Sequence, residues 1–140
     1  MKKILTTMAA LAPAFLFAQV TVQQPTIAAT TQANQPTAIH MTLKNNGNEK
    51  VNLVMLETAS NARLELHGMK NGRMSPISEI PVPAHGETKL KYGGMHIMVY
   101  DLTHPIAVGS TFPVTLFFDN GETLNIKAKA VSPQEMHLHK

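Results

Sequence analysis

The stretch TFPVTLFFDNGETLNIKAKAV, residues 111–131, decides the fold class. A run rich in β-branched and aromatic residues leads into Asp119-Asn120-Gly121, a tripeptide typical of a hairpin turn. After the turn, Leu124, Ile126 and Ala128 alternate with polar residues, as expected for a strand with one buried face. This part of the chain therefore predicts two antiparallel strands.

Segments of the same kind fill the chain before this hairpin. They are apolar or alternating, and Asn, Gly and Pro, which favour turns, separate them. After the first 18 residues no long stretch has helical periodicity. The expected strands cover 37–44, 51–56, 64–66, 87–92, 96–102, 112–118 and 123–131. The proline-rich segment 80–83 is expected at a sheet edge, because proline has no amide donor. The sequence thus predicts one all-β domain, a Greek-key β-sandwich or barrel.

The first 18 residues resemble a secretory signal peptide. Lys2 and Lys3 precede an apolar run over residues 8–17, and the small residue Ala18 precedes polar Gln19. The run is too short to span a membrane, so we expect cleavage after Ala18, export, and no membrane span. Removing 18 of the 140 residues leaves 122, enough for one domain core.

We expect three regions in the exported protein. Residues 19–35, rich in Gln, Thr and Pro, predict an extended N-terminal arm. Residues 36–131 hold the β-domain, and residues 132–140 are expected to form a flexible C-terminal tail.

Composition excludes several classes of function. The chain has no cysteine, which excludes thiol catalysis, zinc-finger sites and blue-copper sites. Loss of Lys2 and Lys3 would lower the formal net charge from +3 to +1, which leaves no basic patch for nucleic acid. No nucleophile, base and orienting acid form a recognisable set, so we do not expect an enzyme.

Soft metal-ligand side chains are the most informative functional feature. His67, Met69 and Met74 are followed by His96 and Met98 on an expected strand. Thioether sulfur and imidazole suit Cu(I), whereas Mg²⁺ and Ca²⁺ prefer oxygen ligands. His96 and Met98 share a strand face, and the flexible pair Gly93-Gly94 would let the loop that carries Met74 approach them. His40 and Met41 also look like a donor pair, but neighbouring residues on a strand diverge, so we discount them as ligands.

The arrangement of these residues resembles the PCuAC (DUF461) family of periplasmic copper chaperones. In that family a His and a Met are followed, after 21 further residues, by His-x-Met. Met74 and His96 are separated by 21 residues here, and Met98 completes the last element. The resemblance covers roughly residues 36–131 and rests on 66–69, 71–76, 80–84, 90–98 and 101–102.

The resemblance implies a cupredoxin-like β-barrel that binds one Cu(I) through His67, Met74, His96 and Met98. It also implies a periplasmic chaperone, expected to be a monomer. This chaperone would pass copper to an acceptor such as a cytochrome oxidase subunit or a thioredoxin-like assembly protein. Six residues separate His67 from Met74, fewer than the usual ten or so, which makes Met69 an alternative ligand.

Other interpretations remain open from the sequence. His137 and His139 near the C-terminus could form a weak second site for Cu(II), or simply be solvated. The protein could instead buffer copper without a dedicated acceptor, or be a metal-free β-sandwich interaction module. Copper binding would eliminate the interaction module, and copper transfer to a copper-free oxidase domain would separate the chaperone from the buffer.

Overall fold

A computed structural model describes residues 18–138 and is almost entirely β-structure. Its one described helix is far too short to cross a membrane, and no other helix occurs within these residues. The elements are β1 (Val20–Ala28), β2 (Thr37–Asn45), β3 (Val51–Glu57), β4 (Arg63–Lys70), β5 (Arg73–Pro76), β6 (Ile80–Val82), β7 (Glu87–Leu90), β8 (His96–Tyr100), β9 (Thr111–Phe118), β10 (Thr123–Val131) and α2 (Pro133–Leu138). The strands expected from the sequence are therefore confirmed to within a few residues.

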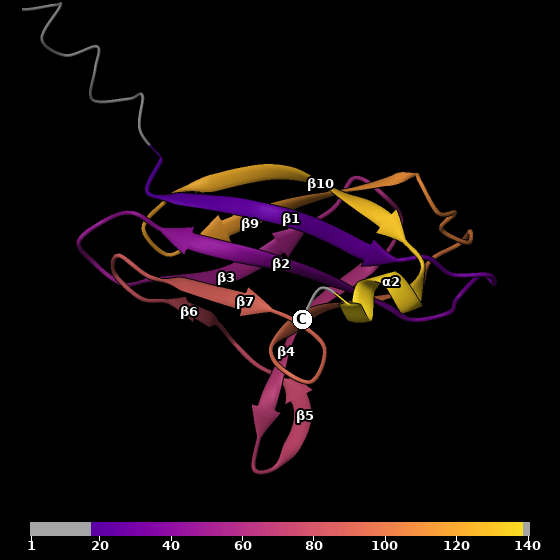
Figure 1. The fold of residues 1–140 in the computed structure, drawn as a ribbon, viewed down its shortest axis with the longest axis horizontal. Coiled ribbons are helices and arrows are strands. Elements are labelled where there is room, and N and C mark those ends of the chain that lie inside the picture. The colour runs from indigo at the N-terminus through magenta and orange to yellow at the C-terminus, as the bar shows by residue number, and fades with distance from the viewer. Residues whose placement is uncertain (1–17, 139–140) are drawn as a thin grey trace, which may run out of the picture.

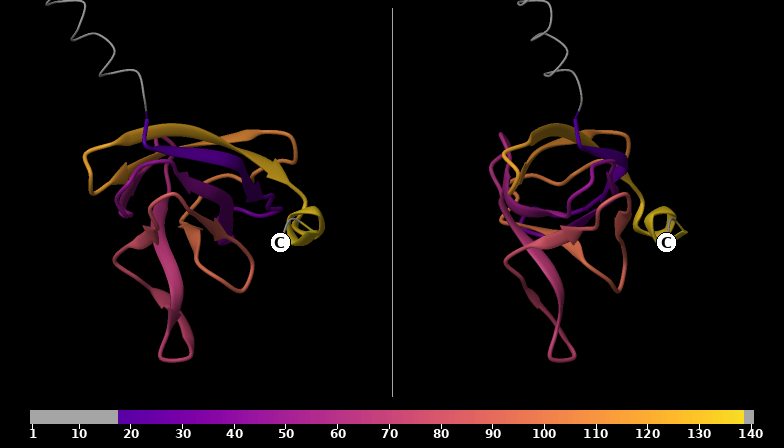
Figure 2. Two further views of the ribbon diagram at one scale, coloured as in Figure 1. Left: turned by 60° about the vertical axis from the view of Figure 1, so that its left-hand side comes forward. Right: turned by 90° about the vertical axis from the view of Figure 1, so that its left-hand side faces the viewer.

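The strands form one curled sheet in the order β5-β4-β8-β2-β1-β10-β9-β3-β6, with β7 also paired to β2. Figure 2 shows the sheet curling around its core, with the β4–β5 hairpin projecting from one end. The all-β class is confirmed. The sheet is mixed rather than purely antiparallel, because β1 and β10 run parallel. The proline-containing β6 lies at a sheet edge, as expected from its missing amide donors.

Alternation along the strands builds the core. In β8, Ile97 and Val99 are fully buried, while His96, Met98 and Tyr100 on the opposite face are half-buried. Each such strand therefore presents one face to the core and leaves the other for polar or functional side chains.

The N-terminal segment is a strand rather than a separate arm, which corrects the expected boundary at residue 36. β1 lies in the middle of the sheet between β2 and β10 (Figure 1). Val20 and Ile27 are fully buried. A bulge between Gln23 and Thr26 shifts the register, and it hid the alternation in the sequence.

The C-terminal tail is also ordered through residue 138, contrary to the expected flexible segment. Ser132 accepts a hydrogen bond at its side-chain oxygen from the backbone N–H of Glu135, and Pro133 starts α2. A serine cap followed by proline is a favourable helix start. Met136 is only 3% exposed and anchors the helix on the domain.

One edge of β2 is shared by two consecutive strands. β7 pairs with residues 41–44 of β2, and β8 pairs with residues 37–39. Between them the chain leaves the sheet as the loop 91–95, which contains Gly93 with φ of 80°. His40 lies at the resulting gap, opposite this loop.

Asn45 at the end of β2 holds the neighbouring turn together. It is 1% exposed, its side-chain amide donates to the carbonyls of Glu49 and Val82, and its side-chain oxygen accepts from the backbone N–H of Gly47. We expect Asn45→Ala to lower the free energy of unfolding by about 2–4 kcal/mol, because it leaves buried backbone groups unpaired. Urea unfolding measures this loss, and Asn46→Ala, at an exposed neighbour, is the matched control. Equal stabilities of the two variants would contradict the assignment.

Candidate metal centre

Three histidines form a row across neighbouring strands. His67 of β4 pairs in register with His96 of β8. His40 of β2 flanks His96 on the other side, one residue beyond the Ile39–Ile97 pair. The ring centroids are 5.7 Å apart for His67 and His96, and 6.4 Å apart for His40 and His96. His96 is therefore the centre of this row, with one imidazole on each side.

A surface hollow lies beside His96 and contains the methionine donors. It is lined by Ala38, His40, Met74, Tyr92, Gly93, His96 and Met98. His96 and Met98 reach it from one face of β8, as their spacing predicted. Met74 comes from β5, and the Gly93 loop forms another wall, which confirms the expected approach of these segments.

The β4–β5 hairpin explains how two methionines come to lie near the site. Asn71 and Gly72 both have positive φ, 54° and 77°, as a two-residue hairpin turn requires. The turn places Met69 and Met74 in register as cross-strand neighbours. Met74 lines the hollow and is 40% exposed, whereas Met69 does not line it and is 56% exposed. The geometry favours Met74 over Met69.

Hydrogen bonds show which ring nitrogens are free. Nδ1 of His96 lies 2.9 Å from the carbonyl oxygen of Gly94 and must donate to it, so neutral His96 has its lone pair on Nε2. Such a bond to the second nitrogen is typical of metal-binding histidines. Nε2 of His67 lies 2.9 Å from Oε1 of Glu65, and that carboxylate also pairs with Arg63. His67 Nε2 is therefore occupied by Glu65.

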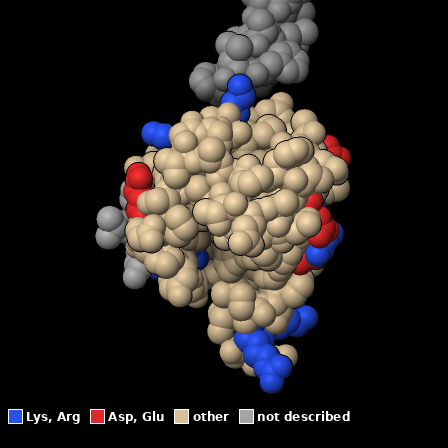
Figure 3. Space-filling model, turned by 90° about the vertical axis from the view of Figure 1, so that its right-hand side faces the viewer, with Lys and Arg blue, Asp and Glu red and all other residues tan. Residues whose placement is uncertain are grey.

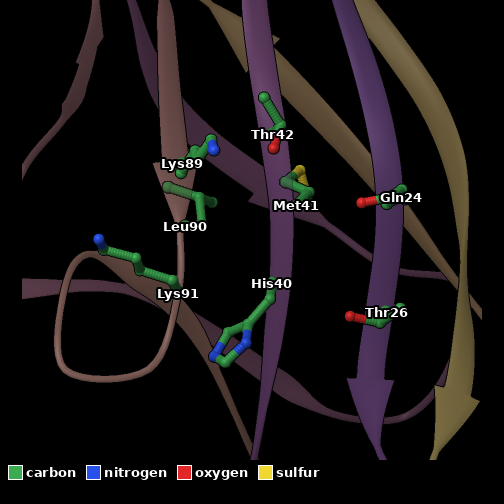
Figure 4. Close-up of a pocket in the computed structure, with 8 residues that line it drawn as sticks. All are labelled: Gln24, Thr26, His40, Met41, Thr42, Lys89, Leu90 and Lys91. Atoms are coloured by element: carbon green, nitrogen blue, oxygen red, sulfur yellow. The ribbon is translucent and has the colours of Figure 1, made fainter. Parts of the chain in front are cut away.

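His40, expected not to be a ligand, lines the hollow beside His96. It diverges from Met41, as predicted, but Met41 is the one that enters the core, with 3% exposure. Figure 4 shows the His40 ring directed from β2 toward the loop after Lys91. Burial, followed by the nearby His96 and His137, lowers the pKa of His40 to about 4. The ring is therefore neutral at neutral pH.

The depressed pKa of His40 predicts an acid-sensitive fold for the copper-free protein. Above about pH 6.5 neither state is protonated at this ring; as the pH falls toward 4 only the unfolded state takes up the proton. We expect this group to remove up to about 3 kcal/mol from the free energy of unfolding over that range. Urea unfolding at several pH values should show a shallower decline for His40→Gln. His104→Gln, in an exposed loop, should decline like the wild type; equal slopes for all three would contradict this origin.

His, Cys, Asp and Glu side chains alone do not form a metal site in residues 18–138. Within residues 18–138 no three His, Cys, Asp or Glu side chains are arranged to hold a metal ion. A site around His96 therefore needs the thioethers of Met74 and Met98 as donors, which favours a soft ion. On the face in Figure 3, most of the surface carries no charge, and basic side chains gather where the β4–β5 hairpin, with Lys70 and Arg73, projects.

The C-terminal histidines lie in two different situations. His137 is in α2, and its ring centroid is 4.5 Å from that of Tyr92, which lines the hollow. His137 therefore lies next to the hollow beside His96. His139 lies outside the described residues.

Comparison with known proteins gives a consistent family. The model of the LpqE-like lipoprotein family matches residues 20–130. The structure resembles the copper-bound PCuAC domain from PmoF2, with a TM-score of 0.73 and 18% identity over 85% of this chain and 97% of that one. Apo-DR1885 from Deinococcus radiodurans is 31% identical over 86% of this chain and 83% of its own, with a TM-score of 0.62.

A solution structure of the Cu(I) form of DR1885 is also similar, with 28% identity over 89% of this chain and 88% of that one, and a TM-score of 0.63. The search of curated proteins gives no match. The family model covers most of the chain, and it includes β1, which lies outside the expected β-domain of residues 36–131. The chain belongs to the LpqE-like family of PCuAC (DUF461) domains.

Proposed function

We propose that this protein is a periplasmic metallochaperone that binds one Cu(I) and passes it on by ligand exchange. The observation that carries the proposal is the hollow beside β8, where Met74, His96 and Met98 converge. His67, next to His96, supplies the fourth ligand once its ring turns from Glu65. Four neutral donors around a monovalent ion give a site with a total charge of +1. Burying this site costs less desolvation free energy than burying the same donors around a divalent ion.

Two relatives support the choice of copper. The PmoF2 domain was solved with copper bound, and DR1885 was solved in a Cu(I) form. Export, the periplasm and cytochrome c oxidase assembly belong to the same proposal, through the leader-like first 18 residues and the family. The weak Cu(II) site at His137 and His139 stays a prediction.

Ligand exchange fits the exposure of the site. Met74 is 40% exposed, so an acceptor can approach the ion on that side and displace one ligand at a time. No redox step is needed, because copper enters and leaves as Cu(I).

A competition titration tests binding. Residues 19–140 are titrated with Cu(I) against a chromophoric chelator under reducing conditions, beside His137→Gln. We expect one tightly bound equivalent in both proteins, because the ion lies at the β8 hollow. Binding that disappears in His137→Gln would move the site to the C-terminal helix, and no binding by either protein would contradict the proposal.

A transfer experiment tests the chaperone role. The loaded protein is mixed with a copper-free oxidase copper domain, and a dialysis membrane between the two proteins is the control. Faster transfer on direct contact than across the membrane supports a chaperone. Equal rates would indicate a copper buffer instead.

A further inference from the structure

We propose that His40 is a copper ligand of this site and competes with His67 for the fourth coordination position beside Met74, His96 and Met98. This inference rests on the proposed Cu(I) function and adds a residue that the family resemblance does not assign. The ion would then have two alternative ligand sets, each with two imidazoles and two thioethers.

The first argument is the position of His40 relative to His96. Two imidazoles that share a metal at about 2.0 Å from each nitrogen have ring centroids roughly 5–6 Å apart. The His67–His96 separation of 5.7 Å falls in this range, and the His40–His96 separation of 6.4 Å lies just above it. A small rotation of either ring about its side-chain bonds brings His40 and His96 to one ion.

The second argument is the shape of the site. β7 and β8 share one edge of β2, and the chain leaves that edge between Leu90 and His96. His40 lies at this gap and lines the same hollow as Met74, His96 and Met98, whereas His67 does not line it. The hollow by itself therefore contains a complete set of two imidazoles and two thioethers.

The third argument is the availability of the ring nitrogens. His40 is only 8% exposed, and no hydrogen bond joins its ring to another residue within 18–138. Its ring nitrogens are not among the fully buried polar atoms that lack a partner, so they open onto the hollow, where an ion can reach them. His67 is equally buried, but its Nε2 already has a partner in Glu65. His40 can bind without breaking an existing hydrogen bond, and His67 cannot bind through Nε2 in this way.

Two competing imidazoles give a simple route for exchange. As His67 turns from Glu65 toward the ion, His40 leaves it, so copper keeps four neutral donors and stays Cu(I) throughout. His67 lies on the strand that continues into the projecting hairpin, whereas His40 lies under the loop 91–95. His40 would therefore hold the ion on the β2 side of His96, and His67 would hold it on the hairpin side.

The test is a double-mutant cycle on Cu(I) affinity with His40→Gln, His67→Gln and the double variant, and with His104→Gln as control. If the two histidines substitute for one another, each single variant should lose less than tenfold in affinity. The double variant should then lose at least a hundredfold. Circular dichroism checks that all variants fold. A double variant no weaker than His67→Gln would overturn the role of His40.

X-ray absorption on the Cu(I)-loaded His67→Gln protein gives a second, direct readout. We expect two nitrogen and two sulfur neighbours, because His40 takes the vacated position. One nitrogen neighbour would overturn the proposal while leaving Cu(I) binding by the wild type intact. Failure of the wild type to bind Cu(I) at all would instead contradict the proposed function on which this inference rests.

Discussion

Replacing His96 by Gln and Met98 by Leu in one protein is expected to abolish tight Cu(I) binding while the domain stays folded. His96 belongs to both of the proposed ligand sets, and Met98 lines the hollow next to it. Both side chains are half-buried on the face of β8 opposite the core, so these shape-preserving changes should alter the free energy of unfolding by less than about 1 kcal/mol. Chelator competition measures the affinity, and urea unfolding measures the stability.

The matched control for this double variant is Met55→Leu with His104→Gln. Met55 is on β3, which is paired with β6 and β9 rather than with β8, and His104 is in an exposed loop. These changes remove the same two residue types and should leave Cu(I) affinity unchanged. Unchanged affinity in the His96 and Met98 variant would show that the ion binds elsewhere.

A substitution on the opposite face of β8 should lower stability and leave Cu(I) binding intact. Ile97 is fully buried, so we expect Ile97→Ala to lower the free energy of unfolding by about 2–5 kcal/mol through lost burial and the cavity that remains. Cu(I) stoichiometry should be retained wherever the variant is folded. Added Cu(I) should also raise its unfolding midpoint, because an ion held by a preformed set of ligands binds the native state more tightly than the unfolded chain.

Val54→Ala, at a half-exposed position of β3, is the control for this second prediction and should change stability by less than about 0.5 kcal/mol. A small loss in Ile97→Ala would mean that β8 contributes little to the core. Together the two β8 variants separate the functional face of the strand from its structural face.

The sequence predicted those features that depend on neighbouring residues. Alternation located the strands and placed His96 and Met98 on one face of β8. The position of His40 beside His96 depends on the pairing of β2 with β8, segments far apart in the chain. No local pattern reports such a pairing, and the divergence of His40 from Met41 along β2 says nothing of which residue lies beside His96.

Two other differences had weak signals in the sequence. The short helix α2 begins with a cap at Ser132 followed by Pro133. It contains a single buried apolar residue, Met136, and one residue cannot show helical periodicity. The bulge in β1 interrupts the alternation of apolar and polar residues, so the composition of the segment, rich in Gln and Pro, predicts an arm rather than a strand. Tertiary packing decided both cases.

The parallel pairing of β1 with β10 has a consequence for folding. Thr26 and Val131, near the two ends of the domain, lie in paired strands, and such contacts join residues roughly 100 positions apart in the chain. During synthesis the backbone N–H and C=O groups on one edge of β1 stay unpaired until β10 has been made. Nascent chains that lack β10 would expose that edge to other chains, so truncation near residue 120 should cause aggregation rather than a smaller folded domain.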